Sequence, residues 1–196
     1  MRLASLLVLG ILALASDYTI KVVRIQAIDA YPARVSSAGV TIAADPYATN
    51  EKTMTAFDIR DLNTRGYYPI HLIIQNSAKE SVTIRTRNIT LATADGQALY
   101  ATSAALVVQD VFKGGFSDKS GSPFADFTKK ELYNRQILPG QTEDGFLFFY
   151  VPKAKGIALA GATIVIPEII DDATRKPIGS FSIPLDPGLP PVPAQK

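Results

Sequence analysis

Apolar side chains occupy every position from 146 to 151, between Gly145 and Pro152. Both faces of an extended chain are therefore apolar, with Phe146, Phe148 and Tyr150 on one and Leu147, Phe149 and Val151 on the other. A turn signal, Pro139-Gly140, precedes the run. Because the run is short and aromatic-rich, it indicates a fully buried strand rather than a helix. We expect this strand to be central in a β-sandwich.

Alternation of apolar and polar residues predicts further strands. In 67–76, Tyr68, Ile70, Leu72 and Ile74 share one face, and Pro69, which has no N–H, indicates a sheet edge or the start of a strand. An irregularity is expected around 86–88, where the inward parity shifts, and Asp95-Gly96 predicts a hairpin. The other predicted strands or apolar segments are 18–30, 40–44, 82–91, 106–112, 162–170 and 178–185.

Only two short helices are predicted. Asn50 is the expected cap of the first, with Met54 and Phe57 facing the core. Thr128 and Glu131 fit a capping box, which predicts a second helix reaching about residue 136. With about eight or nine short strands around them, the pattern favours an all-β antiparallel sandwich with one or two helical inserts.

Three segments between residues 40 and 152 resemble exported bacterial proteins that have an immunoglobulin-like β-sandwich domain and mostly no assigned function. The segments are 66–76, a strand ending in an Asn turn; 82–96, a strand closing in an acidic-Gly turn; and 138–149, a Pro-Gly turn followed by Gly145 and hydrophobic residues. The resemblance implies an immunoglobulin-like sandwich. It supplies no catalytic residues, and a fold alone does not define a function.

The N-terminus predicts export. Arg2 precedes an apolar stretch over 3–14, and Ala13-Leu14-Ala15 matches a signal-peptide cleavage pattern. Asp17 stands where a lipoprotein would carry its acylated Cys. The expected organisation is a signal peptide (1–15), a β-sandwich domain (16–186) and a Pro-rich tail (187–196), located in the periplasm, at the cell surface or outside the cell.

Composition limits the chemistry. A net charge of +2, with scattered charges, gives no case for nucleic-acid binding. A membrane contact is expected only if the N-terminal segment stays uncleaved. The absence of Cys and the presence of one His exclude disulfides, thiolate nucleophiles and the usual zinc sites.

Candidate catalytic groups are few. His71 lies in an apolar strand, where a structural histidine is the expected interpretation. Ser117, Ser120 and Lys119 fall in a polar loop, and Asp58/Asp61 and Asp171/Asp172 are pairs of acids without a metal-binding pattern. We therefore expect no catalytic or metal site, no cofactor and no enzymatic activity.

Two features are candidates for recognition. Tyr67 and Tyr68 form an aromatic pair beside Gly66, and Pro190 and Pro191 lie in the Pro-rich tail. The sequence thus favours a non-catalytic exported module that binds another envelope protein or itself. Two alternatives stay open: self-assembly by strand addition near 67–75, and a hydrolase that uses loop residues 117–122.

Overall fold

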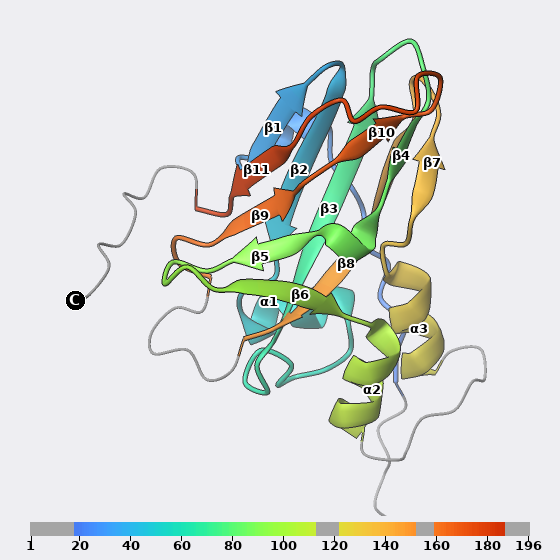
Figure 1. The fold of residues 1–196 in the computed structure, drawn as a ribbon. Coiled ribbons are helices and arrows are strands. Elements are labelled where there is room, and N and C mark those ends of the chain that lie inside the picture. Colours follow the sequence, from blue (N-terminus) through green and yellow to red (C-terminus); the bar gives the residue numbers. More distant parts are fainter. Residues whose placement is uncertain (1–17, 113–121, 152–158, 187–196) are drawn as a thin grey trace, which may run out of the picture.

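The computed structural model describes residues 18–112, 122–151 and 159–186, and this part is mostly β, with two antiparallel sheets and three short α-helices (Figure 1). The strands are β1 (Arg34–Ser37), β2 (Val40–Pro46), β3 (Tyr67–Asn76), β4 (Val82–Ile84), β5 (Thr90–Ala92), β6 (Ala98–Thr102), β7 (Arg135–Ile137), β8 (Thr142–Tyr150), β9 (Thr163–Ile166), β10 (Ile169–Asp171) and β11 (Phe181–Pro184). The helices are α1 (Asn50–Ala56), α2 (Ala104–Phe112) and α3 (Pro123–Lys130), with 3-10 turns η1 (Ile28–Ala30) and η2 (Thr86–Asn88).

The larger sheet has eight strands in the order β1-β2-β3-β8-β6-β5-β9-β11, and the smaller has the order β10-β4-β7. The larger sheet curls, so that β1 and β11 lie side by side although they stand at opposite ends of the strand order (Figure 1). Side chains of both sheets, including Ile84 and Ile169 from the smaller one, share the main core. The mostly β, antiparallel architecture with short helices is confirmed.

Strand β8 is central and buried on both faces, as the sequence predicts. It lies between β3 and β6. Leu147 and Phe149 point into the main core, and Phe146 and Phe148 point the other way, into a second cluster beneath the helices. Tyr150 ends the strand and is exposed. The doubly apolar pattern thus reflects two cores that share one strand.

The second cluster is built largely from aromatic rings. Phe57, just after α1, and Phe127, on α3, have ring centroids 4.2 Å apart. Phe57 also lies 5.0 Å from Phe146, and α2 adds Val107 and Val108. The three helices therefore cover the outer face of β3 and β8, where Figure 1 shows them at one end of the sheet.

Strand β3 follows the predicted alternation. Ile70, Leu72 and Ile74 enter the main core, and His71 and Ile73 lie on the opposite face. The strand is paired on both sides, with β2 and β8, so the alternative of an open edge near 67–75 is wrong, and the other expectation, that Pro69 lies at the start of the strand, is confirmed. Pro69 is tolerated near the start of the strand, where the β2 ladder ends at Ile70.

The first strand begins later than predicted. Residues 18–27 are in no strand, and the first one is β1, which forms a tight hairpin with β2 through Ala38 and Gly39, both at positive φ. The N-terminal segment is instead held by side chains: Tyr18 Oη donates to Asp126 Oδ2 at 2.5 Å, and the Thr19 N–H donates to Asp58 Oδ2 at 2.9 Å. The alternation of apolar and polar residues over 18–30 does not reveal that β1, and not this segment, pairs with β2.

Two predicted helix starts differ from the structure. Thr49, not Asn50, caps α1, since its Oγ1 accepts from the Lys52 N–H. The capping box at Thr128 is wrong: α3 begins earlier, at Ser122-Pro123, and ends at Lys130. Ser122 Oγ accepts from the Ala125 N–H, and Pro is favoured at the first helical position.

Core-facing and strand predictions also need correction. Phe57 is buried, but Met54 is exposed. The segment 106–112 is helical, within α2. The predicted strand 162–170 is divided at Pro167 into β9 of the larger sheet and β10 of the smaller. The irregularity expected at 86–88 is confirmed as η2, which separates β4 from β5.

Candidate functional site

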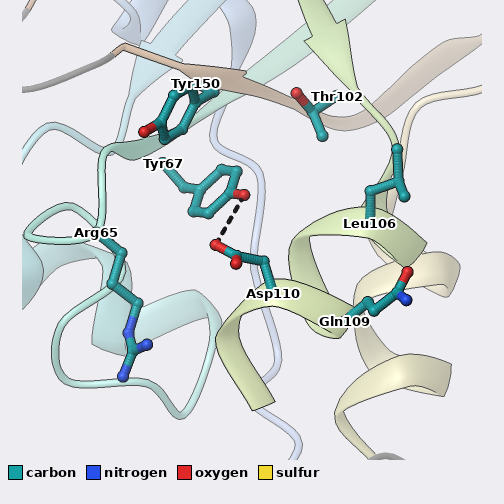
Figure 2. Close-up of a pocket in the computed structure, with 7 residues that line it drawn as sticks. All are labelled: Arg65, Tyr67, Thr102, Leu106, Gln109, Asp110 and Tyr150. Carbon is teal, nitrogen blue, oxygen red and sulfur yellow. Dashed lines mark hydrogen bonds between the residues drawn. The ribbon is translucent and has the colours of Figure 1, made fainter. Parts of the chain in front are cut away.

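An open hollow of about 630 Å³ lies where the ends of β3, β8 and β6 meet α2 (Figure 2). Its lining residues come from these elements and from the loop before β3; they are Arg65, Tyr67, Thr102, Leu106, Gln109, Asp110 and Tyr150. We refer to it as the Tyr67–Tyr150 hollow. The lining combines two phenols, one aliphatic side chain, an amide, a hydroxyl and charges of both signs.

The antiparallel register brings the two tyrosines together. Tyr67 begins β3 and Tyr150 ends β8, and the two residues are paired across the strands. Their ring centroids are 5.2 Å apart at an interplanar angle of 52°. Gly66 permits this approach: it has φ of 92°, and a Cβ there would lie 3.0 Å from the Tyr150 ring. Glycine is therefore suited to position 66, because it adopts a positive φ without strain and leaves room for the Tyr150 ring.

Helix α2 supplies the opposite wall. Leu106 and Asp110 are four residues apart, so they lie on one face of the helix. Asp110 Oδ2 accepts a hydrogen bond of 3.1 Å from Tyr67 Oη, which ties the helix to β3 (Figure 2). Glu131 Oε1 accepts from the Ala104 N–H at 3.1 Å and so fixes the start of the helix.

The two rings differ in accessibility. Tyr67 is 7% exposed and Tyr150 is 46% exposed, so Tyr67 forms the floor and Tyr150 an accessible side. Burial raises the pKa of Tyr67 to about 12, and the hydrogen bond to Asp110 adds to the shift. Tyr67 is therefore a neutral hydrogen-bond donor at physiological pH.

Arg65 is already paired. Its Nε donates to Asp61 Oδ2 at 3.0 Å, and another guanidinium nitrogen lies 2.9 Å from the same oxygen. This hydrogen bond raises the pKa of Arg65, with a smaller contribution from Asp110. Figure 2 shows the guanidinium pointing away from the two tyrosine rings. The charge most directly available in the hollow is thus the Asp110 carboxylate.

This arrangement suits recognition. The Tyr67 and Tyr150 rings lie among polar lining residues, namely Thr102, Gln109 and Asp110. Aromatic rings beside polar groups are characteristic of binding surfaces.

The structure separates the two predicted tyrosines. Tyr67 lines the hollow, whereas Tyr68 is half-buried and packs against the main core, and burial raises its pKa. They do not form an exposed pair, because consecutive residues of a strand point to opposite faces. Pro190 and Pro191 lie outside the described residues, as do the predicted signal peptide and loop residues Ser117, Lys119 and Ser120.

His71 is buried in β3, and its ring is hydrogen-bonded. Its Nε2 donates to Asp144 Oδ2 at 2.6 Å, and its ring stacks on Phe146 with centroids 4.4 Å apart. The imidazole is 1% exposed. The hydrogen bond satisfies one ring nitrogen and the stacking packs the ring, which explains why a polar residue is tolerated at this buried position.

The acidic pairs are engaged in structural contacts. Asp58 receives the Thr19 N–H and lies 3.4 Å from Lys21 Nζ, and Asp61 holds Arg65. Asp172 accepts from Thr83 and Gln136. Across the described ranges, no group of three or more His, Cys, Asp or Glu residues is arranged to hold a metal ion.

Sequence reasoning missed the helical wall of the hollow. The sequence prediction for 106–112 is only an apolar segment, yet Ala104, Val107, Val108 and Val111 have the spacing of one helix face, and the first three are buried. That period would have placed Leu106 and Asp110 together on another face. The pairing of Tyr67 with Tyr150 depends on strand register, which local patterns do not give.

No family model matches the chain, and no curated protein matches it. Three solved structures of bacterial proteins are similar to it, each at 13% identity. The yjhA protein of Bacillus subtilis has a TM-score of 0.47 over 78% of this chain and 96% of its own. The candidate lipoprotein ycdA of Bacillus subtilis has a TM-score of 0.43 over 76% of this chain and 37% of its own. A protein of unknown function from Listeria monocytogenes has a TM-score of 0.38 over 77% and 79%.

These neighbours are β-rich proteins without an assigned function, and they assign none to this chain. As for the membrane, none of the helices in the described part of the chain is both long and apolar enough to span one.

Proposed function

We propose that the protein is an exported, non-catalytic recognition module that binds a protein partner at the Tyr67–Tyr150 hollow. The observation that carries the proposal is the half-exposed Tyr150 ring, held beside buried Tyr67, whose hydroxyl donates to Asp110. Tyrosine is enriched among the residues that dominate binding energy at protein interfaces. Because Tyr67 is fixed by the register and by Asp110, little side-chain entropy is lost there on binding.

Export is the second part of the proposal. It is supported by Arg2, the apolar stretch 3–14 and the Ala13-Leu14-Ala15 pattern. The intact mass of the protein recovered from its native host tests it. A species lacking residues 1–15 is the expected result, and a species that retains them contradicts cleavage.

For the fold, we propose an immunoglobulin-like sandwich whose larger sheet curls over the smaller one. Support comes from the main core, which side chains of the two antiparallel sheets share. The curl distinguishes this chain from a sandwich of two flat layers.

Site-specific photo-crosslinking tests binding at the hollow. A benzoylphenylalanine placed at Tyr150 should give a discrete crosslinked protein in cells of the native host. The matched control is the same probe at Tyr133, which is 44% exposed, nearly as much as Tyr150 at 46%, but is not a lining residue. No adduct at Tyr150, or the same adducts at both positions, would overturn binding at this site.

Self-assembly is a separate outcome of the same experiment. An adduct with the mass of two copies would identify a second copy of this chain as the partner. Light scattering of the purified protein should then give a dimer that Tyr150→Ala converts to a monomer.

A further inference from the structure

The charges around the hollow are not balanced. Asp61 and Asp110 are two acids, and Arg65 is the one base among the lining residues and their ion-pair partners. Asp61 holds Arg65 through two guanidinium nitrogens. Asp110 uses Oδ2 for the Tyr67 hydroxyl, which is a neutral donor. Because the charges around the hollow sum to a negative value, the Asp110 carboxylate attracts a positively charged group.

The apolar part of the hollow fits a long side chain with a charged end. Leu106, 56% exposed, lies one helical turn before Asp110 on the same wall. Tyr150 offers an accessible ring on the other side. The face of an aromatic ring is electron-rich and attracts ammonium and guanidinium groups. Aliphatic stems of Lys and Arg pack on apolar surface while their heads stay near solvent.

From this geometry we infer that the hollow receives a lysine or arginine side chain presented by a protein partner, with its stem against Leu106 and Tyr150 and its head at Asp110. The inference rests on the proposed function and adds the chemistry of the occupant. Gln109 and Thr102 also line the hollow, and each has a side-chain oxygen that can accept a hydrogen bond from the partner.

Two other occupants fit less well. An anionic group would face Asp110, while the only lining cation, Arg65, is neutralised by Asp61. A neutral sugar could stack on Tyr150, but it would leave the charge of Asp110 without a partner. Like charges across an interface are strongly unfavourable, and charge complementarity selects among partners.

The test uses short peptides with one variable residue. Acetyl-Gly-X-Gly-amide, with X as Lys, Arg, Gln or Glu, is titrated into the full chain while backbone amide resonances are recorded by NMR. The Lys and Arg peptides should shift the resonances of Tyr67, Thr102, Asp110 and Tyr150. The affinity should fall as salt is added, because exposed ion pairs are screened. The Glu peptide should shift none of them.

Two variants and one control define the site. Asp110→Asn keeps an acceptor for Tyr67 but removes the charge, and it should weaken Lys-peptide binding by roughly fivefold. Tyr150→Leu removes the ring and should weaken it by roughly threefold. Asp29→Asn, an exposed acid in η1, should leave binding unchanged.

The outcomes separate the inference from the function on which it rests. Equal binding of the Lys, Gln and Glu peptides, or equal binding by wild type and Asp110→Asn, would overturn the cationic occupant. Resonance shifts at Tyr67, Thr102, Asp110 and Tyr150 with cellobiose but not with the Lys peptide would also overturn the cationic occupant. A specific crosslink at Tyr150 would still support the recognition module in either case. Without that crosslink and without peptide shifts, both are overturned.

Discussion

Lys130 and Asp126 form an ion pair almost removed from solvent, with Nζ 2.7 Å from Oδ1 and with the two side chains 14% and 2% exposed. The pair spans one turn of α3 and contacts two other parts of the chain, the N-terminal segment and the end of α1. Tyr18 donates to Asp126, and Lys130 Nζ donates to the Ala56 carbonyl at 2.6 Å and lies 5.1 Å from the Phe57 ring centroid. Burial lowers the pKa of Lys130, and Asp126 opposes that shift. The pair therefore joins α3 to α1 and to the N-terminal segment.

Breaking this pair from one side should be costly. Lys130→Met leaves the buried Asp126 carboxylate without its cation, and we expect it to lower the free energy of unfolding by about 3 kcal/mol. Lys21→Met is the control, because Lys21 pairs with Asp58 in a more exposed position, and it should cost less than about 1 kcal/mol. Urea unfolding followed by circular dichroism measures both. Equal losses would contradict the special role of the buried pair.

The outer face of β8 offers a matched pair of aromatic positions. Phe148→Ala should lower the free energy of unfolding by about 3–5 kcal/mol, because Phe148 is fully buried between β8 and the helices. Tyr150→Ala, two residues along on the same face, should cost less than about 1 kcal/mol, because Tyr150 is half-exposed. Thermal unfolding of the two variants compares them. A large loss from Tyr150→Ala would mean that Tyr150 has a structural role.

Gly145 is required where two segments approach. A Cβ there would lie 2.9 Å from Leu132 Cα, and the Leu132 N–H donates to the Phe146 carbonyl at 2.9 Å. Gly145→Ala should therefore shift this backbone contact and cost about 1–3 kcal/mol. Thr142→Ala, exposed on the same strand, should be nearly neutral. Denaturant midpoints measure the difference, and an unchanged midpoint for Gly145→Ala would show that the contact is not tight.

Tyr67 should ionise at a higher pH than an exposed tyrosine, and its ionisation should lower the free energy of unfolding. Its pKa is raised to about 12 in the folded state, so the neutral phenol stabilises the fold below its ordinary pKa of 10.0, and this contribution is lost as the pH rises towards 12. Absorbance at the phenolate band, compared between wild type and Tyr67→Phe, isolates the titration. We expect the difference to appear mainly above pH 11, about one unit below the raised pKa. A difference centred at pH 10 would contradict burial of the hydroxyl.

Strands β3 and β8 could be predicted from the sequence, because the burial of their side chains sets the pattern of apolar residues. Residues 146–149 lie in two cores, so both parities had to be apolar, and the alternation of 70–74 follows from one buried face. The N-terminal segment shows the limit of this reasoning. Ile20, Val22 and Ile25 alternate with polar residues but are exposed, because nothing pairs with them in the described part of the chain.

The hollow could be predicted only in part. The residue type singles out Tyr67, but an exposed pair with Tyr68 is wrong, because the two side chains point to opposite faces of β3. Asp110 and Tyr150 lie 43 and 83 positions further along the chain, and long-range pairing brings them to Tyr67. The approach of distant segments depends on topology and register, which a local pattern does not encode.

The curled arrangement that sets β1 beside β11 limits how this protein can meet other molecules. Because the two end strands of the larger sheet, β1 and β11, lie beside each other, a peptide strand added to either end would compete with that contact. A partner that meets the larger sheet would then be recognised by surface side chains rather than by an added strand. Selection for a new partner would accordingly alter a handful of such groups and leave the framework intact.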